Sequence, residues 1–564
     1  MDRDATRRIE DFRHNEAGPL ENNLIDELVG GELDRAEFLR RGAMFGLSAG
    51  IMGTLLAYVG EAGAAPVARV VQEAVKKGGT LRIGMLQIGG SLEPYKLNDG
   101  GSLGFSGIPG EYLTFSDKNL KVQPWLATSW KPNADGSVWT FQLRKGVKFH
   151  NGKTMTSDDV VACFKQYTSK GSNALAALGG VLTPEGVSKK GPNTVVFKLV
   201  APNGSFPALV SQTTYMTIIQ PAAIAAKPDT WVKSGMIGTG AFKLKSYTEK
   251  KSAELVRFPE YWGGAAPLDG LRLTFYESST PAVLALKAGQ IDLAQQLTPP
   301  EASPFAGNSR FTTYALPTAA HRMFCMRVDK APFTDSRTRR AVALVLNRPD
   351  LIQRLLLGKG TLGNDSPFWK QFPSTDQTTK QRTQNIVLAK SLLKAAGQEN
   401  LKFKITTHKL LELPDYAAAI QASAKDAGID ISIEVQGDGE YYAGVGGGDY
   451  YTTTPWLNNE ATLTEYGARG VPNQYMTSAY LKGGAWNASH YDNAAFATAA
   501  NSFLTAGDVQ TQRKASKVMQ GLLLRDTPVV TSYFITYTTV SSAKVKNYTP
   551  EGLSHVRVAK TSLA

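Results

Sequence analysis

Residues 137–167, SVWTFQLRKGVKFHNGKTMTSDDVVACFKQY, decide the fold class because a strand pattern gives way to a helix pattern within them. Apolar residues alternate with polar ones from Trp139 to Leu143, which predicts a half-buried strand. A Lys-Gly turn then leads to a second alternation that ends at Phe149. We therefore expect an antiparallel hairpin at this point of the chain.

A helix is expected directly after the hairpin. Thr156 is able to cap it, and Asp158 and Asp159 favour the positive end of the helix dipole. Apolar side chains recur on one stripe of this helix, at Val160, Phe164 and Tyr167. Strands and a helix thus follow one another closely, as in the α/β fold class that the rest of the chain predicts.

The second half of the chain predicts alternating strands and helices. Residues 336–360 form two consecutive expected helices, with a break before Pro349. Strand and helix patterns then alternate in LKFKITTH, LPDYAAAIQASAKDAG, IDISIEVQ and DYYTTTPW, which implies βαβ crossovers and a mainly parallel sheet. After a last helix near 509–524 the chain is β-rich, as in its first half. We therefore expect two lobes, with chain crossings near 315–320 and near 526–531.

The first 64 residues have the pattern of an export leader. Residues 42–60 carry no charge over 19 positions, follow Arg40 and Arg41, and lead to small residues that end at Ala64. This order predicts a signal peptide that is cut after Ala64. An uncleaved membrane anchor is the alternative, because 19 residues are just long enough to span a bilayer. No cysteine lies near the expected cut, which excludes lipid attachment there.

The charge of the chain is uneven. Residues 1–64 hold seven Lys and Arg against twelve Asp and Glu, whereas the whole chain of 564 residues has a net charge of +13. The remainder is therefore strongly basic, a balance that attracts nucleic acid, anionic membranes or acidic ligands. No run of basic residues exceeds two, and no aromatic residues interleave with a basic stripe. We expect solvated lysines and no nucleic-acid partner.

The residues offer no constellation for catalysis or for a metal. The six histidines are isolated from one another, and no G-x-S-x-G sequence occurs. The loop GVKFHNGKT has five residues between its glycines where a phosphate-binding loop has four, and it lies in the expected hairpin. We therefore predict no catalytic residues, no metal and no cofactor. Cys163 and Cys325 either form a disulfide or remain two buried free thiols.

Several longer segments resemble one known family. The first is EYLTFSDKNLKVQPWLATSWKPNADGSVWTFQLRKGVKFHNGKTMTSDDVVACFK, and GTGAFKLKSY, FPEYWGG, ALKAGQIDLA, PFTDSRTRRAVALVLNRPDLI and NASHYDNAAFATA follow in order. They resemble the family 5 extracellular solute-binding proteins, the peptide, opine and nickel type, over most of residues 78–560. The resemblance implies an α/β, two-lobed periplasmic-binding-protein fold of the large class. That fold has an extra subdomain in lobe one, and its mixed sheets are joined by a two-stranded hinge.

This fold divides the chain into expected parts. Residues 1–64 form the leader with its signal peptide, and residues 65–77 form a linker. Lobe I, with the extra subdomain, covers residues 78–317, and lobe II covers residues 318–527. Residues 528–564 return to lobe I.

The resemblance also implies a function. The protein would capture an oligopeptide or a similar polar nitrogenous solute in the periplasm. It would deliver this ligand, as a monomer without enzymatic activity, to the inner-membrane permease and ATPase subunits of an ABC importer. An opine, an oligosaccharide or a metal chelate is the alternative ligand, and a secreted hydrolase is the alternative from another class.

The export route is open. The leader segment LVGGELDRAEFLRRGAMFGLSAG resembles the twin-arginine leaders of some relatives. Ala36 stands where such leaders have their second arginine, so either the twin-arginine route or general secretion fits this chain.

The ligand site is expected between the lobes. In the family, the loop after the first strand, the entry strand of lobe two and the segment after a strand matching DYYTTTPW contribute to it. Trp456 would pack against an apolar part of the ligand, Glu460 would pair with a ligand amine and Arg322 with a ligand carboxylate. Core packing and surface positions are the alternatives for these side chains. The complete set that these regions predict is Gln87, Tyr112, Arg322, Trp456, Asn458, Glu460 and Trp486.

Overall fold

The structure is a computed structural model in which two compact units, Met1–Val75 and Lys76–Ala564, are distinguished. From residue 76 onward it describes every residue except 98, 119, 443–453 and 553–554. Within the first unit it describes residues 10, 12–13, 19–30, 33–34, 37–39, 47 and 49–58.

The first unit contains two helices, α2 (Pro19–Val29) and α4 (Ala49–Tyr58). Helix α4 lies inside the uncharged segment that the leader pattern singles out. A small apolar core joins the two helices, with Leu24, Leu28 and Leu55 buried in it. Among the described residues, no helix has the length and apolar character that a membrane crossing requires. The expected cut after Ala64 lies outside the described residues.

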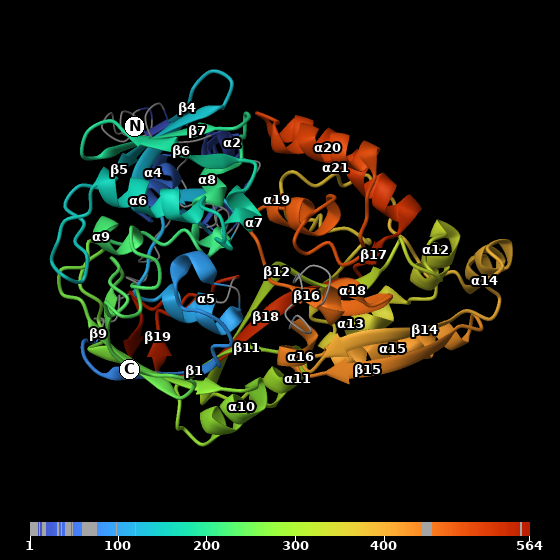
Figure 1. Ribbon diagram of the computed structural model, residues 1–564. Coiled ribbons are helices and arrows are strands. Elements are labelled where there is room, and N and C mark those ends of the chain that lie inside the picture. Colours follow the sequence, from blue (N-terminus) through green and yellow to red (C-terminus); the bar gives the residue numbers. More distant parts are fainter. Residues whose placement is uncertain are drawn as a thin grey trace. The chain divides into compact units, whose positions relative to one another are not determined.

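One mixed sheet organises the second unit (Figure 1). Its strands follow the order β15-β14-β16-β12-β18-β11-β1-β10-β9-β8, with β13 beside β18 and β17 beside β12. β1 is parallel to β10 and β11, and β14 is parallel to β15 and β16, whereas the remaining pairs are antiparallel. The strands of this sheet are β1 (Thr80–Leu86), β8 (Phe242–Thr248), β9 (Ser252–Arg257), β10 (Gly270–Tyr276), β11 (Leu293–Leu297), β12 (Phe311–Met326), β13 (Gly360–Leu362), β14 (Lys402–His408), β15 (Asp430–Gln436), β16 (Ala461–Tyr466), β17 (Val529–Val530) and β18 (Tyr533–Ser542).

Two long strands, β12 and β18, run through both lobes. The first half of β12, from Phe311 to Pro317, pairs with β18, and the register shifts before His321. From His321 onward β12 pairs with β16 and then with β17. This two-stranded hinge confirms the predicted fold. After the expected second crossing near residues 526–531, β17 pairs with the second half of β12, and β18 pairs mainly with its first half.

We use lobe I for the elements up to β11 and lobe II for the elements from α12 to α21. Three smaller sheets accompany lobe I: β2 (Thr114–Ser116) with β3 (Val122–Pro124); the four strands β4 (Ala127–Pro132), β5 (Val138–Leu143), β7 (Thr194–Leu199) and β6 (Leu182–Lys189) in this order; and β19 (Val545–Lys546) with β20 (Ser562–Leu563).

The stretch that decides the fold class lies in the four-stranded sheet. The predicted strand is β5, and its apolar residues pack on Phe164 of the following helix through Phe197. The predicted hairpin is wrong, because β5 pairs with β4 and β7 and the segment up to Phe149 makes only an isolated bridge at Lys148. Long-range pairing thus replaces the local partner that the turn suggested.

The helices of lobe I are short apart from two. They are η1 (Pro94–Lys96), α5 (Gly100–Ser106), α6 (Ser157–Tyr167), α7 (Leu175–Leu178), α8 (Phe206–Leu209), η2 (Gln212–Thr214), α9 (Ala222–Ala225), α10 (Ser279–Lys287), α11 (Pro299–Ala302) and η3 (Ser303–Phe305). Helix α6 begins with the predicted capping at Thr156, which shares a reciprocal cap with Asp159.

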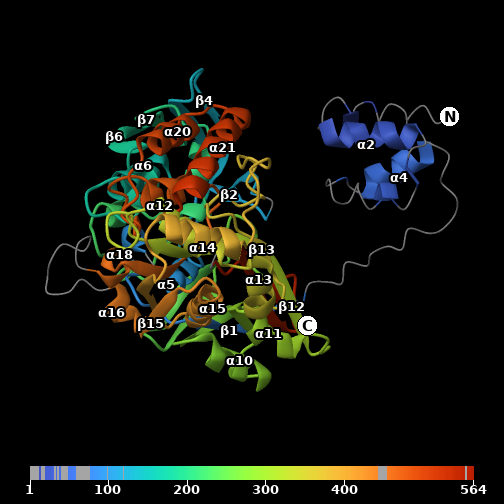
Figure 2. The ribbon, with the colours of Figure 1, turned by 90° about the vertical axis from the view of Figure 1, so that its right-hand side faces the viewer.

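Lobe II holds the longer helices. They are α12 (Ser336–Leu344), α13 (Arg348–Leu356), α14 (Ile386–Ala395), α15 (Leu413–Lys425), α16 (Asp438–Tyr442), α18 (Pro455–Asn458), α19 (Asn473–Tyr475), η4 (Met476–Tyr480), α20 (Ala494–Leu504) and α21 (Val509–Asp526). The predicted break at Pro349 is confirmed, since this proline lies in the first turn of α13. Helices α20 and α21 lie side by side (Figure 2).

One strand prediction in lobe II is wrong where the structure describes it. DYYTTTPW was expected to be a strand, but Pro455 opens the short helix α18, and residues 449–453 lie outside the described residues. Proline favours the first turn of a helix because it has no N–H to donate to a strand ladder. The strand that pairs with β12 is instead β16, a few residues further on.

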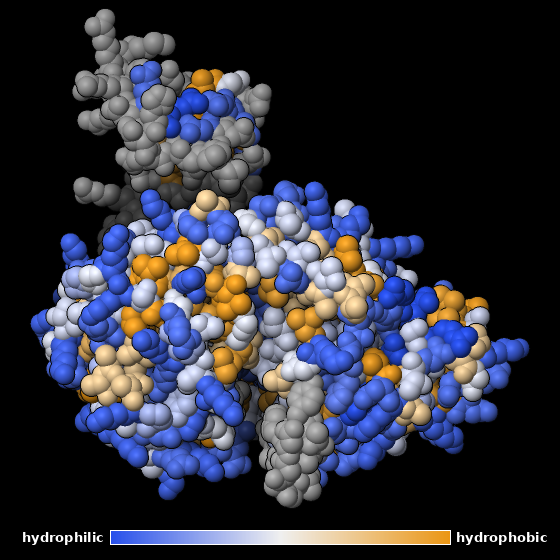
Figure 3. Space-filling model, turned by 45° about the horizontal axis from the view of Figure 1, so that its top comes forward, coloured by the Kyte–Doolittle hydropathy of each residue, from blue (hydrophilic) through white to orange (hydrophobic). Residues whose placement is uncertain are grey.

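The described residues on the face shown in Figure 3 carry mainly hydrophilic side chains. Figure 3 shows them around smaller groups of apolar residues on the described part of the visible face. The two cysteines lie inside: Cys163 and Cys325 are both buried free thiols. Burial raises the pKa of Cys163 to about 12, so this thiol is protonated at neutral pH.

Candidate functional site

The lobes meet at the loop that follows β16, residues 467–474, whose last two residues begin the short helix α19. The hydroxyl of Tyr215, from lobe I, donates a hydrogen bond of 3.1 Å to the carbonyl of Ala468 in this loop. Gly470 lies so close to Thr213 that a Cβ added at Gly470 would approach Thr213 Cγ2 to 2.6 Å. Glycine is therefore required where the loop passes lobe I.

Tyr215 has an unusual backbone conformation. Its φ is 63° and its ψ is −44°, and the N–H of Met216 donates to the carbonyl of Thr214 at 2.7 Å. This is a γ-turn with positive φ, which is strained for a residue with a side chain. The ring of Tyr215 stacks on His555 at 5.2 Å, and its carbonyl accepts a hydrogen bond of 2.9 Å from the Tyr112 hydroxyl. Surrounding contacts thus hold the strained tyrosine in place.

Arg469 lies between aromatic rings from both lobes. Its guanidinium carbon is 4.8 Å from the centre of the Tyr215 ring and 5.7 Å from that of Trp486. Its Nε donates to Gln474 Oε1 at 2.6 Å, and its Nη1 donates to the carbonyl of Ala468 at 2.9 Å. The charge is therefore fixed at the boundary of the lobes by cation–π contacts and hydrogen bonds.

Arg322, at the hinge end of β12, is fully buried in an ion-pair network. Its Nε and Nη2 donate to the two carboxylate oxygens of Glu412, at 2.7 and 2.9 Å. Its Nη1 donates to Glu465 at 2.8 Å. Burial is the largest single influence and acts to lower the pKa of Arg322, but the attraction of Glu412 and Glu465 together outweighs it and leaves the pKa raised. Arg322 therefore stays charged and orients two carboxylates.

Three of the predicted site residues gather at this boundary. Tyr112 contacts Tyr215 of lobe I. Trp486 packs on Tyr466, with ring centres 5.4 Å apart, and on Arg469. Arg322 pairs with Glu465, which precedes Tyr466 on β16. Gln87 lies apart from them at the end of β1, where its side chain donates to the carbonyl of Lys250 at 3.1 Å.

The other three lie toward the far end of lobe II. Asn458 and Glu460 precede the end of β16 that pairs with Met326, and His321 marks the hinge end of the same pairing. The Glu460 side chain accepts the backbone N–H of Lys404 at 2.7 Å, and the Asn458 side chain donates to the carbonyl of Thr454. Trp456 is buried against Tyr442, with ring centres 5.7 Å apart. Trp456 belongs to the same apolar cluster as Tyr466, against which Trp486 also packs, whereas the side chains of Asn458 and Glu460 are bonded to the backbone of lobe II.

Sequence reasoning missed Arg469, Tyr215 and His555. The available signal was the alternation in ATLTEY, which is β16, since the residues after a buried strand are the natural place for a site. Assigning the strand to DYYTTTPW instead moved the expected site toward Trp456. Tyr215 and His555 carry no local signal, because they are 340 positions apart and meet only in the fold.

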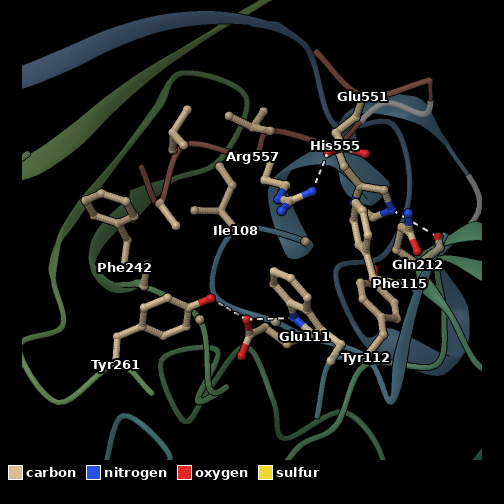
Figure 4. A pocket seen from close by; sticks show the side chains of 18 residues that line it. Ile108, Glu111, Tyr112, Phe115, Gln212, Phe242, Tyr261, Glu551, His555 and Arg557 are labelled. Carbon is tan, nitrogen blue, oxygen red and sulfur yellow. Dashed lines mark hydrogen bonds and ion pairs between the residues drawn. The ribbon is translucent and has the colours of Figure 1, made fainter. Parts of the chain in front are cut away.

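A small cavity of about 80 Å³ lies within lobe I, next to the boundary (Figure 4). Its wall is formed by side chains and backbone from distant parts of lobe I, among them Gly240–Phe242, Val556–Ala559, Glu111, Tyr112 and His555. It has room for a few water molecules and not for a peptide.

The carboxylate of Glu111 lies on the floor of this cavity and accepts four hydrogen bonds. The donors are Trp125 Nε1 (2.9 Å), Tyr261 Oη (2.9 Å), Trp262 Nε1 (2.7 Å) and Thr239 Oγ1 (2.7 Å). Burial raises the pKa of Glu111 to about 7, and these donors oppose the increase. The network ties loops of lobe I together.

Glu551 and Arg557 form the opposite wall of the cavity. They are paired at 3.3 Å, and the Arg557 guanidinium also lies 4.2 Å from the centre of the Phe115 ring. Burial raises the pKa of Glu551 to about 7, although Arg557 acts to lower it. Among the described residues, no cluster of His, Cys, Asp and Glu is arranged to hold a metal ion.

The sequence is similar to those of known solute-binding proteins. A model of the bacterial extracellular solute-binding proteins, family 5 Middle, matches residues 121–488. The nickel-binding protein NikA of Staphylococcus aureus is 25% identical over 476 residues, which cover 82% of this chain and 90% of NikA. The periplasmic oligopeptide-binding protein OppA of Haemophilus influenzae is 26% identical over 462 residues, 74% of this chain and 81% of OppA.

Solved structures share the fold. The periplasmic binding protein DppA of Helicobacter pylori, in complex with the peptide STSA, has a TM-score of 0.72 and 24% identity, covering 86% of this chain and 98% of DppA. NikA of Staphylococcus aureus in complex with Ni(L-His)2 has a TM-score of 0.73 and 22% identity over 86% of this chain and all of NikA. With a hinge of two strands, two lobes that meet at a polar and aromatic boundary, and a family model that matches more than half of its length, this chain belongs to the bacterial extracellular solute-binding proteins of family 5.

Proposed function

We propose that this protein captures an oligopeptide, or a similar polar nitrogenous solute, between its two lobes in the periplasm. It then delivers the solute to the permease and ATPase subunits of an ABC importer. The observation that carries the proposal is the boundary itself, where Tyr215 of lobe I contacts the loop after β16 beside a two-stranded hinge. A hinge of two strands allows the lobes to open and close on a ligand.

The chemistry of the boundary suits a peptide. The half-buried ring of Trp486 offers an aromatic surface to apolar groups and peptide planes. Charges of both signs, on Arg469 and Glu465, match a ligand with a carboxylate and an amine. Relatives named for oligopeptide and glutathione support this class, whereas relatives named for nickel and heme keep a metal chelate as the alternative.

Tyr112 and Trp486 carry the proposal among the residues predicted from the sequence, because both contact the residues that join the lobes. Arg322 supports it by orienting Glu465. Gln87, Trp456, Asn458 and Glu460 stay predictions, and alanine variants in the same binding assay test them. An unchanged affinity of Trp456→Ala would remove this residue from the site.

A thermal-shift screen tests the proposed function. The purified protein, residues 76–564, is heated with di- to pentapeptides, opines, sugars and nickel–histidine in separate samples. A peptide that raises the melting temperature and is recovered unaltered supports the proposal, because a ligand that binds the folded state stabilises it by mass action. A shift with a sugar or a nickel chelate and none with peptides would contradict it.

The same preparation tests the absence of enzymatic activity. Peptide pools are incubated with the protein and analysed by mass spectrometry, and any turnover would favour the secreted hydrolase. We also propose the monomeric state, export by a leader cut near Ala64, and the lobe boundaries at residues 317 and 527. Light scattering, N-terminal sequencing of the secreted protein and limited proteolysis test these three statements.

A further inference from the structure

Two hydrogen-bond donors without partners lie next to each other in the loop after β16. Arg469 uses its Nε and Nη1, whereas its Nη2 donates to none of the residues that the structure describes. Gln474 is 3% exposed, and its Nε2 has no hydrogen-bond partner among the described residues. Because Gln474 Oε1 accepts from Arg469 at 2.6 Å, the Nε2 of the same amide group lies beside the guanidinium.

Two aromatic rings lie against the guanidinium of Arg469. Tyr215 and Trp486 lie over Arg469, with ring centres 4.8 and 5.7 Å from its guanidinium carbon. A hydrogen-bond partner of Nη2 lies in the plane of the N–H groups, which is the geometry of a carboxylate bound to arginine. The carboxylate of Glu465, four positions before Arg469 in the chain, is already paired with Arg322 at 2.8 Å.

The donor set is selective for an acceptor. The guanidinium N–H groups and the amide N–H groups only donate, so a group that only accepts complements both of them. The neighbouring Asn473 supplies a further possible donor: it is 3% exposed, and in the part of the chain that the structure describes neither its amide oxygen nor its amide nitrogen has a hydrogen-bond partner. Buried polar groups without partners are rare in folded proteins and indicate a missing ligand or water.

We propose that Arg469 and Gln474 bind a carboxylate of the captured solute, so that the protein selects solutes with a free carboxylate. The proposal rests on the proposed function, since it places the ligand between the lobes. Tyr215 closes over the bound carboxylate from lobe I, because its hydroxyl contacts the same loop at Ala468. The strained turn at Tyr215 keeps its ring in the position that this contact requires.

Paired peptide pools test the proposal. One pool of tripeptides is synthesised with free C-terminal carboxylates and a second with the same sequences as C-terminal amides, and octopine and maltotriose serve as charged and neutral non-peptide probes. We expect the carboxylate pool to bind at least tenfold more tightly than the amide pool. Gln474→Glu keeps the shape but replaces the N–H donors by an oxygen, so it and Arg469→Gln should each weaken binding of the carboxylate pool at least tenfold.

Two controls keep the outcomes separate. Arg272→Gln removes an exposed arginine on β10 and should bind as the original protein does, and the unliganded melting temperature of each variant reports its folding. Equal binding of the two pools, or normal binding by Arg469→Gln, would overturn the carboxylate site and leave peptide capture intact. Binding of maltotriose alone would overturn both proposals. Binding of octopine alone, lost in Arg469→Gln, would support the carboxylate site and contradict peptide capture.

Discussion

At the scale of single residues, the boundary depends on charges that are already paired inside the protein. Arg322 is fully buried between Glu412 and Glu465. Such a residue contributes to the site by holding its partners rather than by contacting the ligand. Its removal leaves the buried carboxylate of Glu412 without a counter-charge, which is among the costly changes in a folded protein.

We therefore expect Arg322→Leu to lower the free energy of unfolding by about 3–5 kcal/mol, measured by urea denaturation. The matched control is Arg272→Leu on the exposed side of β10, which should change stability by less than about 0.5 kcal/mol. An Arg322→Leu variant as stable as the original protein would show that the ion pairs are not structural. Adding Glu412→Gln to Arg322→Leu should restore part of the loss.

The buried carboxyl of Glu551 makes stability depend on pH. Its pKa of about 7, raised by burial from the ordinary 4.5, means that the folded state holds more protons than the unfolded state between these two values. Stability from this group is therefore complete below pH 4.5 and is lost as the pH rises through 7.

Glu551→Gln should remove this loss. The difference in free energy of unfolding between the variant and the original protein should grow by roughly 1–3 kcal/mol in favour of the variant from pH 5 to pH 8. Urea denaturation at four pH values measures this difference. Burial also lowers the pKa of three histidines to about 4, but their contributions cancel because both proteins contain them: His150, His321 and His555. If the difference in free energy of unfolding did not change with pH, Glu551 would not have the raised pKa.

At the scale of elements, the loop after β16 approaches lobe I without room for another atom. An added Cβ at Gly470 meets Thr213 at 2.6 Å, and the Thr213 hydroxyl lies 3.1 Å from the carbonyl of Ala208, so the threonine is fixed in place. The loop, rather than Thr213, must therefore move. A loop displaced in this way would keep the two lobes from closing fully.

Gly470→Ala should consequently weaken ligand binding by about tenfold, which corresponds to about 1.4 kcal/mol, with little change in unliganded stability. Titration calorimetry with the best ligand of the screen measures the affinity. Gly507→Ala is the matched control, because an added Cβ there meets nothing within 4 Å. The double variant with Thr213→Ala should recover most of the affinity, and failure to recover would place the effect elsewhere.

At the scale of the whole molecule, β12 and β18 connect the lobes, and the register of their pairing shifts between Pro317 and His321. The strands continue on both sides of this shift, so bending there preserves the hydrogen bonds of each lobe. The fold thus allows the lobes to move as rigid bodies about the hinge.

Ligand should therefore compact the molecule as well as stabilise it. At a ligand concentration 100 times the dissociation constant we expect about 2.7 kcal/mol of added stability and a smaller radius of gyration in small-angle scattering. Stabilisation without compaction would mean that the lobes are already closed before the ligand binds, and compaction without stabilisation would contradict binding to the folded state.

Much of the architecture could be predicted from residue patterns. The alternation in β5, the apolar stripe of α6 and the proline at the start of α13 are local signals, and each is confirmed in the structure. Local signals failed where a distant partner decided the outcome: β5 pairs with β4 and β7 rather than with the segment after its turn.

By itself, the sequence determined the family, the two lobes and the two-stranded hinge, because periodicity and motif order are properties of neighbouring residues. Only the tertiary structure decided which side chains meet at the boundary. Tyr215, Arg469 and His555 come from three distant segments, and their contacts depend on how the strands of one sheet are ordered. The physical reason is that burial and hydrogen bonding act through space, so a buried arginine such as Arg322 finds its partners only after the lobes have folded.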